Sequence, residues 1–118
     1  MKAEFEARIE GGWKFLLHQL IIQSEKNEIR IADSIMEFGD ELFSAGNFGD
    51  FDKFLEGCTE HVSKLSAQVI ITVLTVAQWG EAPKRLQNRR KFIDVAREQL
   101  IKTVGPERTE PLLKGLTK

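Results

Sequence analysis

The sequence predicts an all-α protein, an up-and-down helical bundle of four to five helices, two of them long. Apolar residues recur at three- and four-residue steps along most of the chain, which is typical of amphipathic helices. Turns rich in glycine or proline separate these periodic segments. With 118 residues, 42% of them hydrophobic and 30% charged, the chain fits a single folded domain over residues 1–118.

The first helical pattern extends from about residue 3 to residue 45 and has one polar interruption. "QSEKNE" (residues 23–28) favours a break or bend near Asn27, a residue type suited to capping the next helix. A single helix with one solvated turn is the alternative. The apolar positions of this region are Phe5, Ile9, Trp13, Leu16, Leu17, Leu20 and Ile21, followed by Ile31, Ile35, Phe38 and Leu42.

A loop is predicted at "SAGNFGD" (residues 44–50), because glycine and asparagine favour turns, and Asp50 is suited to cap the next helix. One long helix is then expected from about residue 50 to residue 80. Its apolar positions alternate in steps of four and three, which is the seam of a helix packed along another helix. These seam positions are Phe51, Leu55, Cys58, Val62, Leu65, Val69, Thr72, Val76 and Trp79.

Residues 69–76 of this region carry a conflicting signal, because seven of the eight are β-branched and favour strands. Helix is the preferred interpretation, since the seam continues through the segment and no partner strand is found; strand is the alternative. The segment is apolar nearly all round, so it should lie at the centre of the bundle or in an oligomer interface. This surplus of apolar surface predicts a homodimer or larger assembly.

"GEAP" (residues 80–83) ends the long helix, and Pro83 suits the first turn of the next one. Gly105 and Pro106 are expected to end that helix, with a short last helix over about 110–116. The apolar stripe between these limits comprises Leu86, Ile93, Ala96, Leu100 and Val104.

Charge is unevenly distributed although the formal net charge is only −1. Residues 33–60 carry eight acids and one base, whereas residues 84–91 carry five bases and no acid. The five bases are Lys84, Arg85, Arg89, Arg90 and Lys91. On an ideal helix starting at Lys84 they surround the axis, and Arg89 falls within the apolar face. A carboxylate such as Glu56 or Glu60, in the same chain or in a second copy, is therefore the expected partner of Arg89; nucleic-acid phosphates are the alternative.

Aromatic residues gather at the loop before the long helix, where Phe43 precedes Phe48, Phe51 and Phe54. They predict either a plug that closes one end of the bundle or an exposed anchor for a partner. The acidic surroundings of such an anchor would select a basic partner. The predicted protein interface comprises Phe48, Phe51, Phe54, Val69, Val73, Val76 and Trp79.

Nothing in the sequence predicts catalysis: there is no tyrosine, no glycine-rich phosphate loop and no nucleophile motif. Cys58 and His61 have a spacing that could place two metal ligands together, with His18 as the other histidine. Zinc, however, needs three or four protein ligands, and Cys58 is also a seam position. We therefore expect no catalytic residues, no metal and no other cofactor.

The single cysteine and an N-terminal stretch without an apolar leader predict a cytoplasmic protein. The longest apolar run, about 13 residues, is too short for a membrane span. The predicted function is a non-enzymatic protein-interaction module that also self-associates. It could be an adaptor, an inhibitor or antitoxin-like partner, or a small helical subunit of an assembly. The alternative is a nucleic-acid-associated protein that uses the bases of residues 84–91.

Overall fold

The computed structural model describes residues 12–23 and 27–116, and all regular elements in them are helical. The all-α prediction is confirmed, whereas a count of four to five helices is too low. The predicted helical positions Phe5 and Ile9 lie outside the described residues. The elements are α2 (Trp13–Gln23), α3 (Glu28–Ser44), α4 (Phe48–Glu60), the 3-10 turn η1 (Val62–Lys64), α5 (Ala67–Val76), α6 (Ala82–Arg85), α7 (Arg89–Val104) and α8 (Pro106–Leu116).

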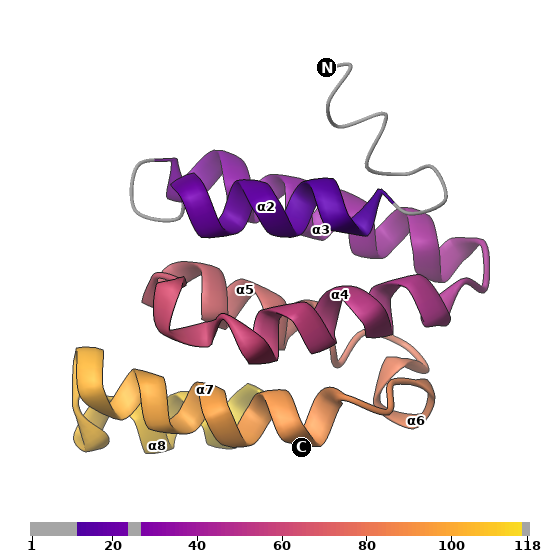
Figure 1. Cartoon of the computed structure of the whole chain (residues 1–118). Coiled ribbons are helices and arrows are strands. Elements are labelled where there is room, and N and C mark those ends of the chain that lie inside the picture. Colours follow the sequence, from indigo (N-terminus) through magenta and orange to yellow (C-terminus); the bar gives the residue numbers. More distant parts are fainter. Residues whose placement is uncertain (1–11, 24–26, 117–118) are drawn as a thin grey trace.

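The six longer helices form three hairpins, α2–α3, α4–α5 and α7–α8, stacked on one another (Figure 1). The first helices of the hairpins form one layer, in which α4 packs between α2 and α7. The second helices form the other layer, in which α5 packs against α3 and also reaches α7. The break predicted near Asn27 is confirmed, because α2 and α3 are separate helices and Asn27 holds the N-cap position of α3.

The prediction of one long helix over 50–80 is wrong, because the chain reverses between α4 and α5. Leu65 is extended, with φ −98° and ψ 139°, and the Ser66 hydroxyl accepts a hydrogen bond from the Val69 amide at 3.3 Å. Ser66 therefore caps a new helix. The seam positions are nevertheless buried in both halves, apart from Val62 and Trp79, which are half-buried. Their spacing predicts the buried face of each helix but does not reveal the reversal.

α5 confirms the helical interpretation of residues 69–76. The hydroxyls of Thr72 and Thr75 donate to the carbonyls of Gln68 and Ile71, each at 2.8 Å, so the polar atoms of this apolar helix are satisfied internally. Among the helices of the described residues, none combines the length and apolar character that a membrane span requires.

α4 begins at Phe48, before the start expected from the sequence, and Asn47 rather than Asp50 caps it. The Asn47 side chain accepts from the Asp50 amide at 3.2 Å and donates to the Asp50 carboxylate at 3.0 Å. Asp50 thus lies in the first turn, where its negative charge is favourable. The preceding turn uses Gly46 at φ +74°, a conformation that strains other residues.

Residues 80–91 contain two helix starts instead of one. Pro83 lies in the first turn of α6, as predicted, but α6 ends at Arg85 and α7 begins only at Arg89. This break changes the phase of the buried stripe, which runs through Phe92, Ala96 and Leu100, while Ile93 is only half-buried. Gly105 ends α7 at φ +89°, as expected, and α8 starts directly at Pro106 rather than near residue 110.

Two glycines allow neighbouring helices to pack closely. A Cβ atom on Gly39 of α3 would overlap the side chain of Val76 in α5, and one on Gly57 of α4 would overlap Leu17 in α2. Val76 is fully buried and its neighbours leave it little room, whereas Leu17 is only half-buried. The contact between α3 and α5 therefore depends on Gly39 more strictly than the contact between α2 and α4 depends on Gly57.

We expect Gly39→Ala to destabilise the protein by up to about 2 kcal/mol. Overpacking typically costs about 1–3 kcal/mol, and replacing glycine by alanine in a helix offsets about 1 kcal/mol of that cost. Gly57→Ala is the matched control and should be neutral or stabilising by up to about 1 kcal/mol, because Leu17 can rotate away and alanine favours the helix. Urea unfolding followed by circular dichroism measures both. Equal stability of the two variants would contradict the packing described here.

Candidate functional site: an aromatic pocket beside a basic segment

Five phenylalanines form a continuous cluster from the core to the surface at one end of the hairpins. Phe51 and Phe54 are fully buried and lie 5.4 Å apart between ring centroids. Phe38 contacts both of them, and Phe43 contacts Phe51 at 5.0 Å. Phe48 is half-buried and stacks on Phe43 at 4.9 Å, with an interplanar angle of 17°. The inner rings therefore close the core, and the half-buried rings of Phe43 and Phe48 reach the surface.

Burial separates the residues predicted for a protein interface into two groups. Phe48 and Trp79 are half-buried and remain accessible. The others are fully buried in the core of the chain, so they cannot contact a partner while the protein is folded: Phe51, Phe54, Val69, Val73 and Val76. α3 and α7 cover the apolar surface of α5 within the chain. Self-association thus stays a prediction, although the apolar surface of α5 does not support it.

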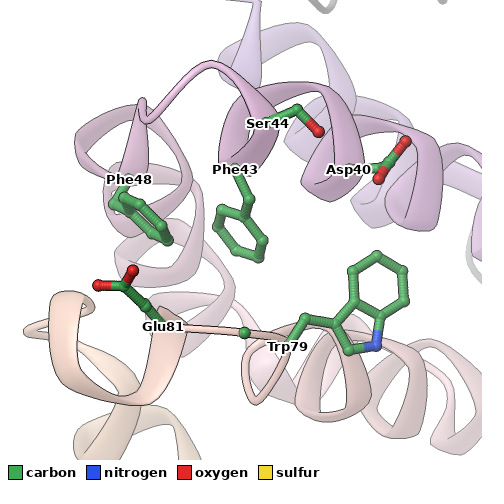
Figure 2. A pocket seen from close by; sticks show the side chains of 7 residues that line it. Asp40, Phe43, Ser44, Phe48, Trp79 and Glu81 are labelled. Atoms are coloured by element: carbon green, nitrogen blue, oxygen red, sulfur yellow. The ribbon is translucent and has the colours of Figure 1, made fainter.

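Phe48 and Trp79 line a surface pocket of about 340 Å³, which we call the aromatic pocket (Figure 2). Its walls come from the end of α3, the start of α4 and the link between α5 and α6. Phe43 and Phe48 lie on one side and the Trp79 indole lies across the gap (Figure 2). The full lining is Asp40, Phe43, Ser44, Phe48, Trp79, Gly80 and Glu81.

The ionisable residues that line the aromatic pocket, Asp40 and Glu81, are both acids and both exposed. Arg85 lies beside the pocket, with its guanidinium carbon 4.8 Å from the centroid of the Phe48 ring. The same guanidinium lies 3.9 Å from the Glu81 carboxylate, and the two side chains are 54% and 75% exposed. An ion pair this exposed contributes about 0–1 kcal/mol. The pocket thus combines aromatic faces with negative charge.

The basic residues predicted as a binding cluster are divided between two helices. Lys84 and Arg85 lie on α6, while Arg90 and Lys91 lie in the first turn of α7; all four are accessible to solvent. Arg89 is half-buried, and its Nη2 atom is buried without a hydrogen-bond partner among the described residues. Burial lowers the pKa of the Arg89 guanidinium, and the charge of Arg90 lowers it further.

Within residues 12–23 and 27–116 of one chain, neither Glu56 nor Glu60 pairs with Arg89. A carboxylate from a second copy stays a prediction. The acidic region (residues 33–60) instead contacts the basic segment (residues 84–91) through hydrogen bonds of Asp52. Its carboxylate accepts from the Asn88 amide at 2.9 Å and from the Asn88 side chain at 3.1 Å. Asn88 is the N-cap residue of α7, so Asp52 places negative charge at the start of that helix.

The pair Cys58 and His61 shows no metal-site geometry. The described residues contain no group of three or more histidine, cysteine, aspartate or glutamate side chains that could hold a metal ion. Cys58 is fully buried, and burial raises the pKa of its thiol. Burial therefore disfavours the thiolate, which is the form that binds metals. His61 is half-buried and occupies the C-cap position of α4.

No protein-family model, curated protein or solved structure matches this chain.

We expect the protein to lose stability as the pH rises above roughly 8.5, the ordinary pKa of a cysteine thiol. The unfolded chain then releases a proton from Cys58 that the folded chain retains, because burial raises the folded-state pKa. The loss approaches about 1.4 kcal/mol per pH unit. Urea unfolding between about pH 7.5 and 10 measures it, and Cys58→Ala should show a flatter dependence. Parallel pH dependences in the two proteins would contradict this assignment.

Proposed function

We propose that this protein is a non-enzymatic interaction module that binds another protein through the aromatic pocket. The observation that carries the proposal is that three aromatic side chains from separate segments (Phe43, Phe48 and Trp79) line one surface pocket. Aromatic residues dominate the binding energy of protein interfaces because they offer a large contact area and few rotatable bonds.

The wall of the pocket is held in place from behind. Phe43 contacts the fully buried Phe51 at 5.0 Å and stacks on Phe48 at 4.9 Å, so the two outer rings rest on the core. A preformed wall supports binding, because little side-chain freedom is lost when a partner docks.

Affinity capture from the native host should return a partner with the wild-type protein but not with Ser44→Arg. Ser44 is exposed and lines the pocket, so an arginine there fills it without disturbing the core. Ser63→Arg is the matched control, because Ser63 is exposed in η1, beyond the opposite end of α4. The captured protein should be retained after nuclease treatment. Equal capture by both variants would reject the pocket as the binding surface.

Light scattering of the purified protein at micromolar concentration tests self-association in the absence of any other protein. A dimer that is lost in Ser44→Arg but kept in Ser63→Arg would identify a second copy of the chain as the partner. A monomer in all three proteins would reject the prediction of a homo-oligomer.

Nucleic-acid binding is the second candidate function, and the accessibility of four bases on α6 and α7 favours it. We expect the wild-type protein to bind a fluorescent oligonucleotide at low salt, and Lys84→Gln/Arg90→Gln/Lys91→Gln to bind at least about tenfold more weakly. The plot of log affinity against log salt concentration should become less steep, because up to about three phosphate contacts are lost. Fluorescence anisotropy measures both, and no binding by the wild type at about 20 mM salt would reject this function.

A further inference from the structure

We infer that the aromatic pocket accepts the guanidinium group of an arginine side chain, carried by a segment of the partner protein. The inference rests on the proposed function and specifies what the partner presents. It follows from three features of the pocket: the chemistry of its walls, the position of Arg85 and its size.

The walls combine the two groups that attract an organic cation. The rings of Phe43, Phe48 and Trp79 line the pocket, and the face of an aromatic ring attracts a cation placed over it. Asp40 and Glu81 add carboxylates at separate edges of the opening (Figure 2). The described residues that line the pocket include no base. The carboxylates repel an anionic ligand, whereas an organic cation is attracted by both the rings and the carboxylates.

The chain's own Arg85 indicates that a guanidinium suits these walls. It lies 4.8 Å from the Phe48 centroid and 3.9 Å from the Glu81 carboxylate, so it uses one ring and one acid of the pocket at once. Arg85 is not among the residues that line the pocket, which leaves Phe43, Trp79 and Asp40 for a second guanidinium. Arginine fits better than lysine, because its planar group stacks on rings and forms paired hydrogen bonds with carboxylates.

Arg85 competes only weakly with a partner's arginine for the rings and carboxylates of the pocket. Its contacts are largely solvent-exposed, so a partner's arginine can displace them at little cost. Its positive charge repels a second cation as well. Removing the charge of Arg85 should therefore strengthen binding, which is the opposite of what the loss of a structural contact would do.

The size of the pocket fits one side chain of a partner. A volume of about 340 Å³ lies at the lower end of the range of small-molecule sites. The carboxylates at its rim are exposed, so the partner backbone can pass over the opening while one side chain enters. The remaining affinity must then come from contacts outside the pocket.

The test uses Nα-acetyl-arginine amide as the probe and follows the indole N–H resonance of Trp79 by NMR. Nα-acetyl-citrulline amide is the neutral isostere, and Nα-acetyl-lysine amide is the second cation. We expect saturable shifts with an arginine dissociation constant on the order of millimolar, weaker binding of lysine and no saturation with citrulline.

Variants that remove one charge at or beside the pocket test whether electrostatic attraction contributes to arginine binding. Asp40→Asn and Glu81→Gln should each weaken arginine binding about two- to fivefold, and Arg85→Gln should strengthen it by a similar factor. Asp33→Asn is the matched control, because Asp33 is exposed on α3 outside the pocket and should leave the affinity unchanged. Raising the salt concentration should weaken binding in every protein.

Equal binding of citrulline and arginine, or tighter binding of lysine, would overturn the inference. A Trp79 resonance that shifts on dilution without any probe would overturn it too, because a second copy would then occupy the pocket. Loss of capture by Ser44→Arg without arginine binding would leave the proposed function standing and reject only the arginine. Arginine binding with unchanged capture by Ser44→Arg would support the cation site and reject its role in holding the partner.

Discussion

The burial of α5 is the constraint on which the rest of the fold depends. Six of its ten residues are buried, and a fully buried aliphatic side chain contributes about 1.5–3 kcal/mol. An apolar helix of this kind needs neighbours on several sides. α3 and α7 provide them, and Gly39 lets α3 approach closely. The reversal at residues 61–66 meets the same need, because a straight continuation of α4 would carry α5 away from the helices that cover it.

The position of α5 also determines where the aromatic pocket forms. The chain leaves α5 at the end of the hairpins where α3 turns into α4, so Trp79 emerges opposite Phe43 and Phe48 (Figure 2). The phenylalanine cluster spans the boundary between core and surface at this point, from fully buried Phe51 to half-buried Phe48. On the side of Phe43 and Phe48 the pocket is consequently an opening of the core, whereas Trp79, Gly80 and Glu81 belong to the link between α5 and α6.

The sequence predicts which residues are buried better than it predicts where one helix ends and the next begins, and α4 and α5 illustrate why. Periodic spacing predicts the buried face of each helix, but it is identical for one long helix and for two helices that each keep the period. The reversal depends on the Ser66 cap, which is a weak signal in a polar stretch. The carboxylate partner predicted for Arg89 assumes one unbroken helix from Lys84. α7 instead begins at Arg89, and this start turns Phe92 toward the core. Phe48 and Trp79 could each be predicted as interface aromatic residues, but their pairing depends on tertiary packing.

The separation of charge around the pocket explains why a free cation alone should be a poor ligand. The basic segment of α6 and α7 adjoins the acidic lining, and Arg85 lies at the boundary between them. Cations at the start of α7 are unfavourable there by about 0.3–1 kcal/mol each, and Asp52 offsets part of this through its hydrogen bonds to Asn88. The positive charges that remain repel any incoming cation. An arginine therefore binds well only when the segment that carries it makes further contacts, and this requirement selects a protein partner over a small organic cation.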